Sequence, residues 1–180
     1  MRTITRATLA LTGAAALTLF AVVPANAVDS TVTVQVVGVP ATITTGAVSA
    51  SGEILPNAAA SVTISDVFVN DGRAVVGDWS VTASASAFVG LAGADAAAFA
   101  DTAIGYTPGG LETSAGSAAV LATTVADLST ADANAESVAT NAAVQGVNSA
   151  TWDAVLEIPV PVDAIAGSYS TTITHTLIAE

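Results

Sequence analysis

The sequence predicts an all-β fold, an Ig-like β-sandwich of antiparallel strands. Several short runs alternate apolar and polar residues with a period of two, turn-forming residues separate these runs, and no long segment has the helical period. The chain of 180 residues contains no cysteine. Strand pairing and side-chain packing must therefore hold the domain together without disulfides.

Residues 1–27 have the pattern of a secretory signal peptide. Two arginines precede an apolar run that ends at Val23, and the sequence before Val28 fits the small-residue cleavage rule. The apolar run is too short for a comfortable membrane span, and no later segment approaches the required length. We expect a secreted extracellular protein whose mature form, residues 28–180, is a single domain without a membrane span.

The expected mature chain is strongly acidic. Once the two arginines of the signal are removed, Arg73 is its one basic residue against 15 acidic ones, a formal charge of −14. Nucleic acids and anionic lipids are recognised through clustered lysine and arginine. The charge therefore excludes both as partners and suits a soluble extracellular protein.

The first half of the mature chain contains four expected strands. They are Val32–Val39, closed by Pro40, a short strand over Thr42–Val48, a strong strand over Ser61–Val69, and the clearest alternation over Trp79–Phe88. Residues 52–57 form a turn between the second and third. Asn70-Asp71-Gly72 is a turn signal, so the third and fourth strands are expected to form a hairpin.

The middle of the chain, residues 90–150, is rich in Ala, Gly, Ser and Thr and predicts less. Its composition suggests a helical turn over Ala94–Ala100, a loop over Gly105–Gly110, a strand over Ala118–Val125, and a loop or short helix over Asp127–Val138. The pattern recovers over Trp152–Val160. Because Pro159 and Pro161 cannot donate to a ladder, that strand ends there or lies at an edge. Residues 164–167 turn, and the last strand begins at Tyr169.

The two tryptophans should be central to a core otherwise built from small side chains. Trp152 alternates with apolar residues and is expected in the core. Trp79 shares a face with Val81, so it is either a core anchor or a platform for a ligand. His175, the only histidine, lies on the apolar face of the last strand and is either a packed residue or a functional one.

Three stretches together resemble a known family of bacterial surface proteins. They are SVTISDVFVNDGRAVVGDWSVTASASAF (61–88), TWDAVLEIPVPVDAIAGSYS (151–170) and YSTTITHTL (169–177). Their order, a V-x-D-x-R…W element, then a V-P…A-G-x-Y turn and a closing strand, is similar to that of the WxL-domain proteins of Gram-positive bacteria. The resemblance covers most of residues 31–180. The motifs depart from the family as Trp79-Ser80-Val81, with valine for leucine, and His175-Thr176-Leu177, with histidine for tryptophan.

The resemblance implies a function at the cell envelope. It implies a secreted protein that associates non-covalently with the cell wall, binding peptidoglycan or another wall polymer through Trp79, Val81, His175 and Leu177. Aromatic faces stack on sugar rings, and an imidazole can stack and also hydrogen-bond. The alternative is a structural or adhesive surface subunit that binds other extracellular proteins through a strand edge or its acidic surface.

The residues favour a protein that is not an enzyme and has no metal or cofactor. The single histidine lies in mid-strand without a nucleophile elbow, and zinc with one histidine and no cysteine is disfavoured. The region around the connection between the third and fourth expected strands is rich in oxygen-bearing side chains, namely Asp66, Asn70, Asp71 and Asp78. Their spacing is not that of an EF-hand loop. They are either turn formers near Arg73 or a calcium site, and we expect any ion pair with Arg73 to be exposed and weak.

Overall fold

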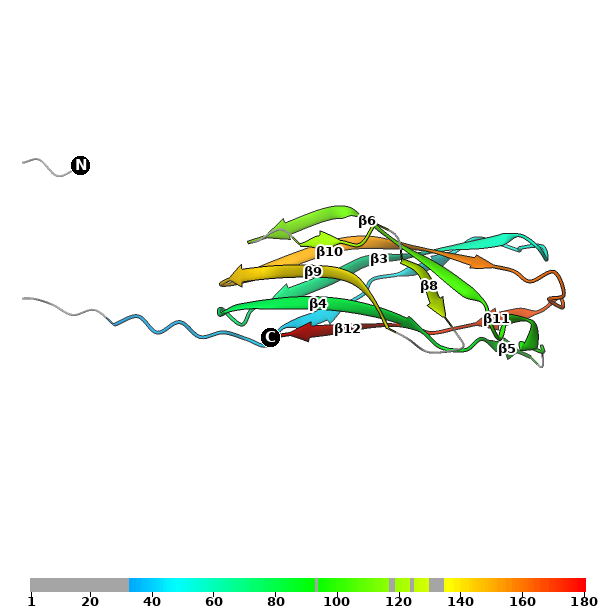
Figure 1. The fold of residues 1–180 in the computed structure, drawn as a ribbon, viewed down its shortest axis with the longest axis horizontal. Helices are drawn as coiled ribbons and strands as arrows, with labels where there is room; N and C mark the ends of the chain where they lie inside the picture. The colour runs from blue at the N-terminus through cyan, green and yellow to red at the C-terminus, as the bar shows by residue number, and fades with distance from the viewer. Residues whose placement is uncertain (1–32, 93, 117–118, 124, 130–134) are drawn as a thin grey trace, which may run out of the picture. The chain divides into compact units, whose positions relative to one another are not determined.

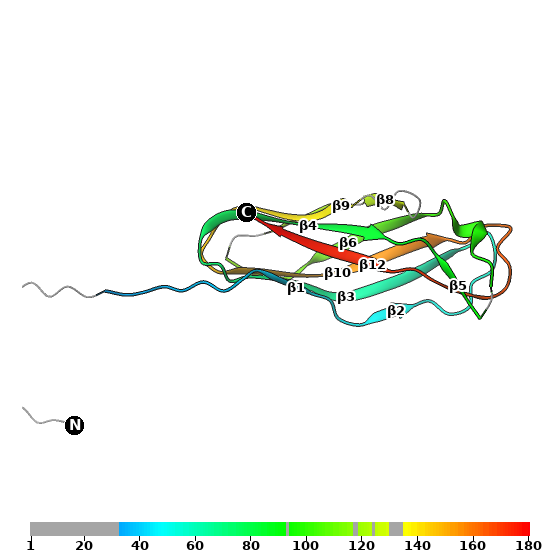
Figure 2. The same cartoon turned by 90° about the horizontal axis from the view of Figure 1, so that it is seen from below.

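The computed structural model describes residues 33–180 except 93, 117–118, 124 and 130–134. Residues 35–180 form one compact unit. Its strands are all paired antiparallel, and two sheets pack face to face (Figures 1 and 2). The predicted all-β sandwich is confirmed, whereas residues 1–27, the predicted signal, lie outside the described residues.

The first sheet has the order β1-β3-β10-β6-β8, with β2 also on β3; the second has the order β12-β4-β9-β7; and β5 pairs with β11. The strands of the first sheet are β1 (Thr42–Thr44), β2 (Val48–Ala50), β3 (Ala59–Asp71), β6 (Ala103–Ala115), β8 (Val125–Ser129) and β10 (Asn148–Pro159). Those of the second are β4 (Val76–Ala85), β7 (Val120–Leu121), β9 (Glu136–Gln145) and β12 (Ile173–Ala179). The short pair is β5 (Val89–Leu91) with β11 (Ser168–Ser170), and the 3-10 turn η1 spans Ala97–Phe99.

The core lies between the two sheets and contains both tryptophans. Trp79 of β4 and Trp152 of β10 are 2% and 0% exposed, so their central place in the core is confirmed. Each belongs to a strand in which buried and less buried residues alternate. One face of each sheet is therefore apolar and packs inward, because successive side chains of a strand point to opposite faces.

The expected hairpin between the third and fourth strands is wrong. β3 pairs with β10, β1 and β2, whereas β4 pairs with β12 and β9. The turn around Gly72 carries the chain from one sheet to the other instead of folding it back within a sheet. Both strands keep their apolar faces inward, so the alternation alone is compatible with either connection.

The middle of the chain, residues 90–150, contains more strand than its small side chains predict. Residues 105–110 lie within β6 and are not a loop. Tyr106 and Pro108 point into the core, and the β8 partner of β6 reaches only as far as Tyr106, so no ladder bond to β8 is required of the proline. The helical turn over 94–100 is confirmed as η1.

The remaining predictions for the middle are partly wrong. Of residues 118–125, only Val120–Leu121 and the first residue of β8 are strand, and 118 and 124 lie outside the described residues. The loop or short helix expected over 127–138 is wrong for 127–129, which belong to β8, and for 136–138, which belong to β9, while 130–134 lie outside the described residues. Small residues permit strand as readily as loop when neighbouring strands supply the hydrogen bonds.

Both ends of the domain differ from their expected strands. Residues 33–39 have no strand partner, so the strand expected over Val32–Val39 is wrong where the structure describes it, and residue 32 lies outside. The strand over 42–48 is broken into β1 and the start of β2. The last strand is interrupted after β11, where Thr171 Oγ1 donates to the Ser86 carbonyl. By contrast, β10 ends at Pro159, as expected, although it is a central strand.

Candidate functional site

Trp79 and Val81, the two predicted ligand positions on β4, point into the core. They are 2% and 0% exposed. The Trp79 indole Nε1–H donates to Asn148 Oδ1 at 2.7 Å, so even its polar atom is used inside the domain. Neither side chain presents a face to a polymer outside the sandwich.

The structure brings the second motif directly beside the first. β12 pairs with β4 so that Leu177 lies opposite Val81 and Ala179 opposite Trp79. His175 and Leu177 are half-buried on the inward face, as the alternation predicts. Two motifs almost a hundred residues apart in the chain therefore form one two-stranded unit at the edge of the second sheet.

His175 is anchored by a hydrogen bond across the sandwich. Its Nε2 lies 2.9 Å from the Tyr106 hydroxyl, and the two rings meet edge to face with centroids 5.6 Å apart. The same hydroxyl accepts from the Trp152 indole Nε1–H at 3.3 Å. Because an indole nitrogen can only donate, the tyrosine hydroxyl accepts from Trp152, and its own proton is available to His175 Nε2. In the tautomer with its proton on Nδ1, a neutral imidazole accepts that proton at Nε2.

Burial sets the ionisation of this pair. It lowers the pKa of His175 from the ordinary 6.5, because a charged imidazole would lose its hydration. It raises the pKa of Tyr106 to about 12 for the corresponding reason. Both groups are neutral near pH 7, which is consistent with the hydrogen bonding just assigned.

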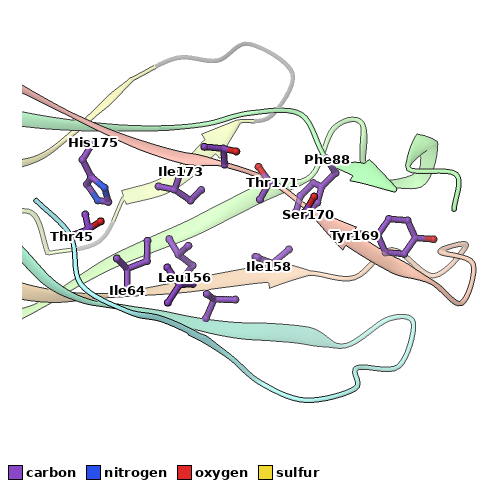
Figure 3. A pocket seen from close by; sticks show the side chains of 13 residues that line it. Thr45, Ile64, Phe88, Leu156, Ile158, Tyr169, Ser170, Thr171, Ile173 and His175 are labelled. Atoms are coloured by element: carbon purple, nitrogen blue, oxygen red, sulfur yellow. The ribbon is translucent and has the colours of Figure 1, made fainter. Parts of the chain in front are cut away.

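A groove opens at the edge of the sandwich, and His175 forms part of its wall. It has a volume of about 400 Å³, and Figure 3 shows Ile173 and His175 of β12 on one wall, facing Ile64 and Leu156 on the other. Val48 of β2, at the rim, is exposed. Among the described residues that line the groove, none is Asp, Glu, Lys or Arg. The groove therefore lacks these charged side chains, and it combines apolar side chains with the hydroxyl-bearing residues Thr45, Tyr169 and 170–172.

The middle residues of both motifs, Ser80 and Thr176, point outward. They belong to a row of side-chain hydroxyls on the outer surface of the second sheet, which we call the hydroxyl face. It consists of Ser80, Thr82, Ser84, Thr140, Thr174 and Thr176. The register places Thr176 beside Thr82 on neighbouring strands, and Ser80 beside Thr140. The hydroxyls therefore form a regular array across three strands.

The outer surface of the first sheet is acidic instead. Asp66, Glu112 and Asp153 come from its three adjacent strands β3, β6 and β10, and Asp153 Oδ1 accepts from the Asp66 backbone N–H at 2.9 Å. Repulsion from Asp153, with smaller contributions from burial and Asp66, raises the pKa of Glu112. Within the described residues, no group of three or more His, Cys, Asp or Glu side chains is placed to hold a metal ion.

The ion pair of Arg73 is not the exposed pair expected from the sequence. Its partner Asp71 is 1% exposed, and the guanidinium bonds both carboxylate oxygens, Nε to Oδ1 at 2.9 Å and Nη2 to Oδ2 at 3.0 Å. Asn148 Nδ2 also donates to Asp71 Oδ2, at 3.3 Å. Because Asn148 holds the Trp79 indole as well, this pair is connected to the first motif through a chain of buried hydrogen bonds.

Two residues that position the motifs were not singled out from the sequence. The sequence predicts a loop around Tyr106 because Gly and Pro surround it, and Asn148 lies in a segment without a clear pattern. A tyrosine in a run with alternating apolar residues was the only available signal for the first. No local signal marks Asn148, because its two partners come from β3 and β4.

Comparisons with protein-family models, with curated proteins and with solved structures found no match to the chain. The resemblance to WxL-domain proteins and the Ig-like assignment therefore remain predictions. In the part of the chain that the structure describes, no helix has the length and apolar character needed to cross a membrane.

Proposed function

We propose that this protein is secreted and associates non-covalently with the bacterial cell wall through its hydroxyl face. The observation that carries the proposal is the array of serine and threonine hydroxyls on the outer surface of the second sheet. Ser80 and Thr176, the middle residues of the two signature motifs, belong to this array. The resemblance to wall-associated proteins and the hydroxyl face thus concern the same two strands.

The geometry of a sheet makes this array suitable for an extended polymer. Neighbouring strands lie about 4.8 Å apart, and every second residue along a strand is separated by roughly 6.8 Å. Each hydroxyl both donates and accepts hydrogen bonds, as do the hydroxyl and amide groups of peptidoglycan. Individual contacts of this kind are weak, but a polymer that meets several at once gains from multivalency.

In this proposal Trp79, Val81, His175 and Leu177 do not contact the wall; their inward side chains hold the strands of the hydroxyl face in place. Trp79 and Val81 hold β4 in the core, and His175 and Leu177 hold β12 against it. The hydrogen bond from the Trp79 indole to Asn148 fixes one end of this unit, and the His175–Tyr106 bond fixes the other. The exposed residues between them would contact the wall.

Co-sedimentation with protein-free sacculi tests the proposal. The chain from Val28 is compared with a Thr82→Ala/Thr176→Ala variant, which removes two adjacent hydroxyls of the face. The matched control is Thr63→Ala/Thr107→Ala, the same chemical change on the outer surface of the first sheet. Circular dichroism confirms that each variant is folded.

Wall association predicts that the unmodified chain and the control pellet with sacculi and that the hydroxyl-face variant pellets several-fold less. If the unmodified chain stays in the supernatant, wall binding is excluded. If both variants bind equally well, the wall contact lies elsewhere on the surface.

A structural or adhesive subunit is the second candidate function, and the edge strand β12, which among the described strands is hydrogen-bonded on one side only, favours it. Such an edge offers backbone donors and acceptors to a strand from another chain. A subunit of this kind would bind proteins and leave stripped sacculi in the supernatant.

A further inference from the structure

The segment before β1 has the sequence of a β-strand but pairs with no strand among the described residues. Residues 33–39, which we call the valine arm, carry Val34, Val36, Val37 and Val39, and these side chains are 57–78% exposed. A lone exposed valine is ordinary, but four in seven residues with high strand propensity are not. The arm therefore has apolar side chains and backbone hydrogen-bonding groups available for another surface.

Residues 35–39 of the arm leave the domain at the end opposite the groove. The Val39 N–H donates to the Gly72 carbonyl at 2.7 Å, which fixes the base of the arm beside the β3–β4 connection. Residues 35–39 run away from the sandwich at that end (Figures 1 and 2). Ile64, in the groove, lies seven residues back along β3 from Asp71, or about 23 Å. To reach the groove of its own chain, the arm would have to reverse direction and break its bond to Gly72.

The groove has properties that suit a strand with apolar side chains. It is lined by apolar side chains of β3, β10 and β12, and its rim beside Val48 is open to solvent. One wall is β12, which among the described strands is hydrogen-bonded only to β4, although β1 also lies near it; Ile173 and His175 of β12 line the groove. A strand placed there would pair with β12 and bury alternate side chains between the two sheets.

The charge of the chain is compatible with an occupant from a second copy at these two surfaces. The full mature chain has a formal charge of −14, so two copies repel at long range. The valine arm contains no charged residue, and the described lining of the groove contains no Asp, Glu, Lys or Arg. The two surfaces that would meet are therefore the ones on which this repulsion is locally weakest.

We propose that the valine arm of one copy adds as a strand to β12 of the next, with its valines in the groove. The contact is head to tail, because the arm and the groove lie at different places on the domain. Contacts of this type do not close on themselves unless the rotation forms a ring, so they generate extended assemblies. The inference does not depend on wall binding and specifies the surface-subunit alternative.

Cysteine cross-linking tests the contact directly, because the natural chain contains no cysteine. Val34→Cys and Val48→Cys variants of the chain from Val28 are mixed under mild oxidation. The matched control replaces Val48→Cys with Val120→Cys, an equally exposed valine on the opposite edge of the second sheet. Strand addition predicts heterodimers from the first mixture at least ~10-fold faster than from the control, because the docked arm raises the effective concentration of the thiols.

Self-association provides the second readout. Analytical ultracentrifugation of the unmodified chain should show mass that grows with concentration and with salt, since salt screens the repulsion between copies. A Val34→Asp/Val36→Asp variant should remain folded and associate at least ~10-fold more weakly, because two carboxylates would enter a groove that has no Lys or Arg in its described lining.

Two results would overturn the inference. One is equal cross-linking of the two mixtures, and the other is a monomer at all accessible concentrations. An intramolecular disulfide in a monomeric Val34→Cys/Val48→Cys chain would show that the arm occupies its own groove instead. Sacculus binding by a strictly monomeric chain would leave the proposed wall function standing while refuting this contact.

Discussion

Replacing Arg73 with methionine should destabilise the domain far more than loss of a surface ion pair would. Methionine keeps much of the aliphatic stem but leaves Asp71, which is 1% exposed, without its counter-ion. The change removes both side-chain bonds from the guanidinium to the carboxylate. It also removes the bonds from Nη1 to the Glu180 carbonyl at 2.6 Å and from Nη2 to the Asp78 carbonyl at 3.0 Å.

The burial of the carboxylate determines the magnitude. Breaking a buried pair by removing one partner costs about 3–5 kcal/mol, whereas an exposed pair contributes roughly 0–1 kcal/mol. The Arg73 side chain is 19% exposed against 2% for that of Asp71, so water reaches one side of the pair. We therefore expect a loss near the lower limit, about 3 kcal/mol in the free energy of unfolding at pH 7.

The pH dependence distinguishes this mechanism from a general packing defect. Hydrogen bonding to Arg73 lowers the pKa of Asp71 below 3.8, so the pair stabilises the fold above about pH 4 and loses its contribution as pH falls through the lowered pKa. Without Arg73, burial should instead raise the pKa of Asp71. Protonation of the Asp71 carboxylate at low pH would then remove the cost of burying an unpaired charge in the variant. The difference in stability between the two proteins should shrink from pH 7 to pH 3.

Urea unfolding followed by tryptophan fluorescence at both pH values measures this difference. Gln35→Glu is the matched control, because it also changes the net charge by −1 but at an exposed position. It should change the stability by less than about 0.5 kcal/mol. A loss below about 1 kcal/mol for Arg73→Met, or a loss that does not depend on pH, would refute the argument from burial.

Three further predictions follow from the remaining polar contacts. Tyr106→Phe should cost about 1–3 kcal/mol in urea unfolding, because the buried Trp152 indole N–H loses its acceptor; a neutral result would contradict the hydrogen bonding assigned here. His175 should titrate by NMR below pH 6.5, and the stability linked to its lowered pKa should be complete above that pH and decline as pH falls below it; a midpoint above 6.5 would oppose the burial argument. Glu112→Gln should raise the melting temperature at pH 7 but not at pH 3, because repulsion from Asp153 raises the pKa of Glu112 and protonation relieves that repulsion; equal effects at both pH values would exclude it.

Much of the candidate site was predictable from alternation in the sequence. The inward positions of Trp79, Val81 and Leu177 follow from a period of two, because side chains of a strand alternate between faces whatever its neighbours are. The same alternation places Ser80 and Thr176 outward. The alternation does not tell which of these two faces binds a ligand, because it is equally regular on both faces.

The partners of these strands were not predictable in the same way. An apolar face on β3 is satisfied equally well by a hairpin with β4 or by packing across the core, and only long-range contacts choose between them. The same contacts bury Asp71 and bring the Tyr106 hydroxyl to His175 from a segment that looks like a loop.

The sequence by itself determined the all-β class, the inward faces, the core position of Trp152 and the acidity of the chain, because these depend on composition and on neighbouring residues. Only the tertiary structure decided that the two motifs share one sheet edge, that the ion pair of Arg73 is buried, and that the valine arm pairs with none of the described strands. The reason is that pairing and burial are set by residues far apart in the chain, whereas alternation is a local property.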